Sequence, residues 1–164
     1  MKLTQVAAQL YAVRDFCQTA GGLAAAARFR AAGLTLGHHN HDIEFLEFRG
    51  APARDHIYTH TDPRNLVGEL DTYWVHYGGG DCVDWCRKLR GRLSFIHLKD
   101  YGITRERKPV HCEIGADTLP FPQIIREAEL SGCRWFIVEQ DTCPRDPFAS
   151  LKISFDYIRA NLAA

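Results

Sequence analysis

The stretch Leu66-Val67-Gly68-Glu69-Leu70 is an almost continuous apolar run, and the polar group Asp71-Thr72-Tyr73-Trp74 follows it directly. Short runs with little polar alternation are typical of parallel strands that are buried on both faces. Five such runs occur along the chain, which predicts a sheet of about five parallel strands. They are Gln5–Leu10, Leu34–His39, Leu66–Leu70, Leu93–Leu98 and Trp135–Glu139.

Helix signals lie between these runs. Asp81 is placed to cap one helix, Pro122 fits the first turn of a second, and Asp146 with Pro147 begins a last one. Two segments are less regular: 14–32 is helical in pattern but interrupted by two glycines, and 49–65 suits a short helix of its own. Alternating strands and helices predict an α/β fold with a parallel sheet.

Length and composition limit the classes of protein. The 164 residues predict a single domain, 1–164. Lys and Arg together number 20, as do Asp and Glu, so no global charge would attract nucleic acid or an anionic membrane. No apolar run approaches the length of a membrane span or of a secretory signal, so we expect a cytoplasmic protein. The six cysteines include no CxxC pair, and we expect reduced thiols.

Polar side chains lie at or just after the ends of four of the runs, and they include Glu44, Asp71, His97 and Glu139. Glu44 precedes Asp71 by 27 positions and Asp71 precedes His97 by 26, each near the length of one βα unit. Because the carboxyl ends of parallel strands share one edge of the sheet, these groups should converge. Three carboxylates and one imidazole favour Mn²⁺ or Mg²⁺, with Co²⁺ or Zn²⁺ as alternatives.

Neighbouring side chains predict a substrate site. His39 and His41 share one face of a strand, and Lys99 shares the face of His97, so all three can contact substrate oxygens. Trp74 suits either substrate contact or plain packing at the rim. A zinc site made of the adjacent histidines is disfavoured, because successive strand residues point to opposite faces.

Several motifs in order resemble the xylose isomerase-like TIM-barrel superfamily, the sugar phosphate isomerase/epimerase group. They are His39-Asn40-His41-Asp42-Ile43-Glu44-Phe45, Leu70-Asp71-Thr72-Tyr73-Trp74, His97-Leu98-Lys99-Asp100, Glu113-Ile114-Gly115 and Val138-Glu139-Gln140-Asp141.

The resemblance implies a divalent metal held by Glu44, Asp71, His97 and Glu139, with Glu44 and Glu139 also carrying protons. It implies isomerisation or epimerisation of a sugar or sugar phosphate by proton transfer next to a carbonyl, through an enediolate. A dehydratase of an inosose-like substrate would use the same proton abstraction. The DNA-repair endonuclease branch of the superfamily is disfavoured by the neutral charge and by the small number of ligands.

The resemblance runs from the first strand almost directly into the fifth, so the region of strands two to four is missing. A full barrel needs about 250 residues, and about five strands would leave open edges and an exposed apolar face. Three outcomes follow: a homodimer that completes the sheet, which we favour, an open sheet covered by helices, or an unstable product. A non-catalytic metal- or sugar-binding module is therefore the alternative function.

Overall fold

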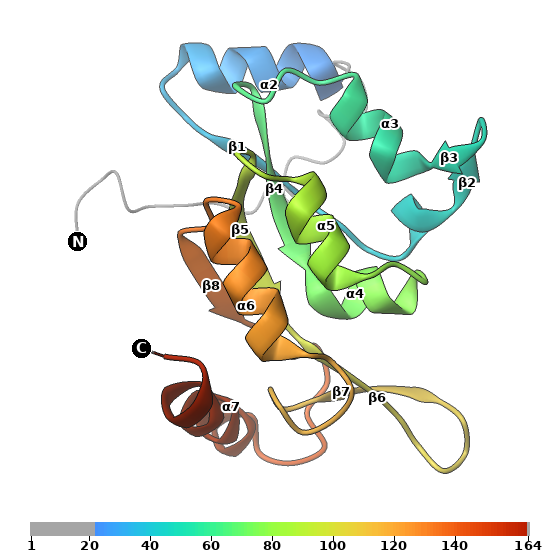
Figure 1. Ribbon diagram of the computed structural model, residues 1–164, viewed down its shortest axis with the longest axis vertical. Coiled ribbons are helices and arrows are strands. Elements are labelled where there is room, and N and C mark those ends of the chain that lie inside the picture. The colour runs from blue at the N-terminus through green and yellow to red at the C-terminus, as the bar shows by residue number, and fades with distance from the viewer. Residues whose placement is uncertain (1–21, 164) are drawn as a thin grey trace.

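A computed structural model describes residues 22–163, and its centre is a four-stranded parallel sheet (Figure 1). The strand order is β1-β4-β5-β8, and every neighbouring pair is parallel. The strands are β1 (Leu36–His39), β4 (Leu66–Asp71), β5 (Leu93–Leu98) and β8 (Trp135–Val138). Four of the five predicted strands are confirmed, and the fifth, Gln5–Leu10, lies outside the described residues. Within residues 22–163 the sheet is open and does not close into a barrel.

Helices connect the strands, and two of them, α5 and α7, begin at the caps that the sequence predicts. The Asp81 carboxylate accepts a hydrogen bond from the backbone N–H of Asp84, and the Asp146 carboxylate accepts one from Ala149. Gly132, with φ of 92°, follows the end of α6. The helices are α2 (Gly22–Ala31), α3 (Ala53–Thr59), α4 (Thr72–Tyr77), α5 (Cys82–Lys88), α6 (Phe121–Leu130) and α7 (Pro147–Asn161).

Helix α4 was not predicted, although its first residues belong to a motif that the sequence analysis singled out. Its cap is Asp71, whose carboxylate accepts a hydrogen bond from the backbone N–H of Trp74. Asp71 is thus both the last residue of β4 and the N-cap of α4, and the capping hydrogen bond holds its carboxylate at the edge of the sheet.

Between β5 and α6 the chain forms an antiparallel hairpin of β6 (Asp100–Ile103) and β7 (Pro109–Cys112), which projects from the end of the sheet (Figure 1). The base of this hairpin is held by the buried carboxylate of Asp100. It accepts hydrogen bonds from four backbone N–H groups, those of Tyr101, Gly115, Asp117 and Leu119. A second small hairpin, β2 (Glu47–Phe48) with β3 (Ala51–Pro52), follows the short helix η3 (Ile43–Phe45).

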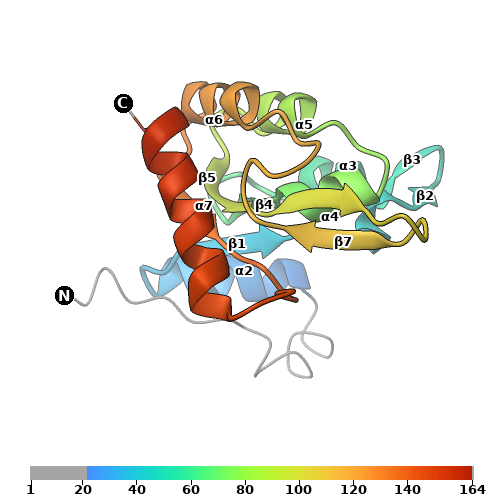
Figure 2. The same cartoon turned by 90° about the horizontal axis from the view of Figure 1, so that it is seen from below.

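The two faces of the parallel sheet are covered unequally. Helices α5 and α6 lie together on one side of it (Figure 2), over Leu70, Leu93, Ile96 and Leu98, which are all 1% exposed or less. Alternation along the strands places Val67, Phe95, Trp135 and Ile137 on the opposite face. These are only partly buried, and Trp135 is 57% exposed. Within residues 22–163, no helix is long and apolar enough to cross a membrane.

Candidate functional site

The ends of all four parallel strands contribute to one cluster of possible metal ligands. His39 ends β1, Asp71 ends β4, His97 is the penultimate residue of β5, and Glu139 follows β8. Each offers one ligand atom, and these four atoms all lie within 4.8 Å of one another. Three of the four predicted ligands therefore come together, as expected for carboxyl ends that share one edge of a parallel sheet.

Hydrogen bonds join the members of this cluster. His39 Nε2 lies 3.2 Å from Asp71 Oδ2, and His97 Nδ1 lies 2.7 Å from Glu139 Oε2. The other ring nitrogen of His97 lies 3.0 Å from Glu69 Oε1. The rings of His39 and His97 are neighbours, with centroids 4.6 Å apart. Both nitrogens of His97 thus face carboxylates.

Lys99 supplies positive charge at the centre of the acids. Its buried Nζ lies 3.0 Å from Asp71 Oδ2, 2.9 Å from Glu139 Oε2 and 3.0 Å from Asp141 Oδ1. The sequence predicts Lys99 as a ligand of substrate oxygens, and in the structure its ammonium group contacts these three carboxylates. The mutual repulsion of the acids is therefore reduced by a residue of the chain itself.

The pKa values of the cluster reflect these charge pairs. Burial alone would lower the pKa of His97, but hydrogen bonds to Glu139 and Glu69 outweigh it and raise this pKa to about 9. Burial alone would raise the pKa of Asp71, but the His39 hydrogen bond and the Lys99 charge hold it below its usual value. The hydrogen bond to His97 likewise lowers the pKa of Glu139, followed by that from Lys99. Near neutral pH the chain therefore holds two carboxylates beside an imidazolium and an ammonium group.

Two buried side chains fix the strand ends that carry these groups. Asn40 accepts a hydrogen bond from the backbone N–H of Asp71 at 2.9 Å, which ties the end of β1 to the end of β4. The Thr72 hydroxyl accepts from the backbone N–H of Lys99 at 2.9 Å and lies 2.8 Å from the carbonyl oxygen of the same residue. The start of α4 is thereby tied to the end of β5, so the cluster rests on a rigid frame.

Glu44, the fourth predicted ligand, is not brought into this group of four. The chain leaves β1 after His39 and turns into η3, so Glu44 lies five residues beyond the strand end. There its Oε2 accepts a hydrogen bond from the backbone N–H of His41 at 2.9 Å, and its Oε1 is 4.0 Å from His38 Nε2. His39, which the sequence analysis assigns to substrate, takes the corresponding place in the cluster.

The remaining predicted substrate residues lie next to the cluster. The exposed ring of His41 is 5.1 Å from the ring of His39 and 5.2 Å from that of Trp74. The Trp74 ring is also 5.8 Å from Lys99 Nζ. These side chains together form one wall beside the carboxylates.

Three residues of the site were missed by the sequence analysis. Glu69 lies two positions before Asp71, and Asp141 two positions after Glu139, so the period-two rule for strands could have found both. His111 lies on β7, with its Nε2 3.7 Å from Asp141 Oδ2. No sequence signal could have found it, because only the fold of the hairpin brings it to the cluster.

The donor set fits a divalent metal. Two imidazoles and two carboxylates are ligands that Mn²⁺, Co²⁺ and Zn²⁺ all accept. Their ligand atoms lie within 4.8 Å of one another. His39, Asp71, His97 and Glu139 are thus the residues that could hold one.

Comparison with known proteins assigns the fold. A sugar phosphate isomerase/epimerase from Parabacteroides distasonis is 28% identical, with a TM-score of 0.72 over 85% of this chain and 49% of its own. A xylose isomerase domain protein from Alicyclobacillus acidocaldarius is 16% identical, with a TM-score of 0.59 over 94% of this chain and 59% of its own. The chain has the fold of a partial xylose isomerase-like TIM barrel.

A curated relative of the partial barrel is the inosose dehydratase of Geobacillus kaustophilus, which is 30% identical over 144 residues. That match covers 77% of this chain but 46% of the relative. The partial barrel thus spans about half the length of this relative and of the sugar phosphate isomerase/epimerase. No family model matches it.

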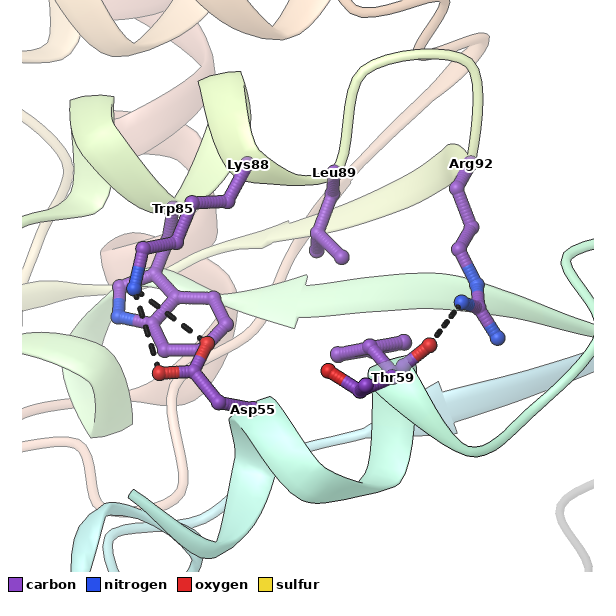
Figure 3. Close-up of a pocket in the computed structure, with 7 residues that line it drawn as sticks. Asp55, Thr59, Trp85, Lys88, Leu89 and Arg92 are labelled. Carbon is purple, nitrogen blue, oxygen red and sulfur yellow. Dashed lines mark hydrogen bonds and ion pairs between the residues drawn. The ribbon is translucent and has the colours of Figure 1, made fainter. Parts of the chain in front are cut away.

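A separate pocket of the partial barrel lies between α3 and α5 (Figure 3). Its charged side chains are already paired: Lys88 Nζ is 3.4 Å from both Asp55 carboxylate oxygens, and Arg92 donates to the carbonyl oxygens of Leu66 and Tyr58. None of the predicted site residues lines this pocket.

Proposed function

We propose that this chain binds one divalent metal ion, Mn²⁺ by preference, at the strand-end cluster and acts on a sugar, sugar phosphate or related polyol. The observation that carries the proposal is the convergence of His39, Asp71, His97 and Glu139 within 4.8 Å. The sugar phosphate isomerase/epimerase neighbour and the inosose dehydratase relative support the substrate class.

The reaction would be proton transfer next to a carbonyl, through an enediolate. A bound divalent ion would supply positive charge for substrate oxygens that become negative. Glu139 would take the proton, because its carboxylate belongs to the cluster and its side chain is 40% exposed. Glu44, at the rim beside His41, would return the proton. Trp74 and His41 would orient the substrate beside Lys99.

Metal content tests the first half of the proposal. Purified protein should bind about one Mn²⁺ per chain, and Asp71→Ala and His97→Ala should each weaken binding by at least about tenfold. Asp156→Ala, at an exposed acid on α7, is the matched control and should bind normally. Unchanged metal binding in both cluster variants would disprove the assignment.

The same titration decides between His39 and Glu44 as the fourth ligand. Because the structure places His39 in the cluster, His39→Ala should weaken Mn²⁺ binding, whereas Glu44→Gln should leave it within about threefold. The reverse result would mean that η3 rearranges to bring Glu44 to the metal.

Turnover tests the second half. A panel of keto-sugars and an inosose should be incubated with the Mn²⁺-loaded chain, and both epimerised and dehydrated products followed. Dehydration alone would favour the inosose-type reaction, for which the curated relative is the supporting observation. Glu139→Gln should abolish either activity.

A non-catalytic module that binds metal or sugar is the second candidate. The observation that favours it is coverage, because the chain spans 46% of the curated relative and part of the rim of a full barrel has no counterpart here. Stoichiometric Mn²⁺ binding and saturable sugar binding without turnover would assign this function.

We also propose that a second copy of the chain covers the open face of the sheet. All-parallel sheets are found almost only with both faces covered, yet Trp135 is 57% exposed here. Sedimentation should show a dimer at micromolar concentration. A monomer that remains stable would mean that the open sheet suffices by itself.

A further inference from the structure

Two buried polar atoms beside the cluster have no hydrogen-bond partner within residues 22–163. They are Trp74 Nε1 and His111 Nδ1. An unpartnered buried polar atom destabilises a folded chain, so each such atom in a native structure calls for a physical explanation. These two belong to neighbouring rings, which suggests a common explanation.

The rings meet at the edge of the proposed active site. Their centroids are 6.1 Å apart and their planes nearly perpendicular, at 85°. The Trp74 ring lies 5.8 Å from Lys99 Nζ, and His111 Nε2 lies 3.7 Å from Asp141 Oδ2. His111 is 8% exposed and packs edge-on against the Tyr73 ring at 4.1 Å. Both rings therefore lie beside the Lys99–Asp141 pair, and their unpartnered nitrogen atoms are shielded from bulk solvent.

The position of His111 is fixed by the hairpin. It lies directly opposite Tyr101 in the pairing of β6 with β7. The base of that hairpin is held by the four backbone N–H groups that donate to Asp100. A group bound at His111 would therefore meet a preformed partner, which reduces the entropy lost on binding.

The two atoms differ in hydrogen-bonding character. The indole Nε1–H can only donate. The Asp141 carboxylate facing Nε2 of His111 favours the tautomer with its hydrogen on Nε2, which leaves Nδ1 as an acceptor. One donor and one acceptor suit a hydroxyl group, since a hydroxyl accepts one hydrogen bond and donates another. A phosphate or carboxylate group could use only the donor.

We propose that Trp74 Nε1 and His111 Nδ1 form a subsite for one hydroxyl group of a sugar or polyol, with His111 as a specificity-determining residue. This inference rests on the proposed function of the cluster as a sugar or polyol site. A site built to pair a substrate hydroxyl rejects an analogue without it, because its buried polar groups are then left unpaired.

Calorimetric titration of the Mn²⁺-loaded chain with myo-inositol and with D-fructose tests the subsite. His111→Asn places an amide atom near the position of Nδ1, His111→Gln places one near Nε2, and His111→Phe removes both. Affinity for the probe that binds should fall about tenfold in the Gln and Phe variants and less than about threefold in the Asn variant. Trp74→Phe should also weaken binding about tenfold.

Thermal melting of the ligand-free chain supplies the second readout. Because His111→Phe removes an unpartnered buried atom and keeps the ring, its melting temperature should equal or exceed that of the wild type. A lower melting temperature with unchanged affinity would show that His111 is structural and would overturn the proposal. Equal affinity losses in the Asn and Gln variants would also overturn it, as would the failure of both probes to bind the wild type.

Failure of the proposed function gives a different result. Absence of turnover, with the Asn and Gln variants still differing in affinity, would leave the subsite intact and reject the reaction. Turnover with an unchanged KM in His111→Phe would reject the subsite and leave the reaction intact.

Discussion

The two faces of the four-stranded sheet are made by the same strands yet have opposite character. On the face under α5 and α6, Leu70 and Ile96 are fully buried, and the neighbouring side chains are apolar. On the other face, His97 and Glu69 pair with each other, and Trp135 is 57% exposed. Successive residues of one strand therefore have different roles: those on one face pack in the apolar core, and those on the other face carry the polar groups of the cluster.

The largest expected effect comes from a matched pair of isoleucines on neighbouring strands. Ile96→Ala, on the helix-covered face, should lower the free energy of unfolding by about 3 kcal/mol, because it leaves a cavity in a packed core. Ile137→Ala, on the open face, should lower it by about 1 kcal/mol, since that side chain is only partly buried. Urea unfolding measures both, and equal losses would mean that the open face is packed in solution.

Lys99→Met should produce the next largest effect. It leaves Asp71, Glu139 and Asp141 without their shared ammonium group. We therefore expect the free energy of unfolding of the metal-free chain at neutral pH to fall by about 2 kcal/mol. The loss is below that of a fully buried pair because Glu139 and Asp141 are partly open to water.

Mn²⁺ should offset that loss, because a divalent ion replaces the missing charge beside the same carboxylates. The rise in melting temperature on adding Mn²⁺ should therefore be larger for Lys99→Met than for the wild type. A smaller rise in the variant would show that Lys99 helps the metal to bind rather than replacing its charge.

The dependence of stability on pH should be opposite in sign with and without metal. The pKa of His97 is raised from 6.5 to about 9, so its contribution to the metal-free chain is fully present below about pH 6.5 and is lost as the pH rises through about 9. Metal binding needs the neutral imidazole, so Mn²⁺ affinity should increase over the same range.

Unfolding midpoints between pH 5 and pH 10 check both statements. His97→Asn should remove most of the alkaline loss in the metal-free chain. An unchanged alkaline loss in this variant would assign the titration to another group.

The smallest expected effect on stability is that of Trp135→Thr on the open face. The side chain is 57% exposed in β8, so the free energy of unfolding should change by less than about 0.5 kcal/mol at low protein concentration. Sedimentation of the same variant should show weaker self-association. Unaltered association would place the contact between copies elsewhere.

Much of the fold was predictable because its signals are local. Continuous apolar runs identified β1, β4, β5 and β8, and Asp81 and Asp146 act as the predicted helix caps. Helix α4 was missed because its signal, the capping carboxylate of Asp71, was interpreted only as a metal ligand. The β6–β7 hairpin was missed because its position depends on Asp100 gathering backbone groups from residues far along the chain.

The sequence by itself determined the parallel direction of the strands and the convergence of Asp71, His97 and Glu139. Each stands at or next to the carboxyl end of its strand, and the helices between successive strands make those strands parallel. Only the tertiary structure decided that His39 joins them and that Glu44 turns aside, because the path of the chain after β1 depends on η3 and its hydrogen bonds. It likewise decided the central place of Lys99 among three acids and of His111 beside Trp74. Such positions arise from contacts between distant segments, which local spacing does not encode.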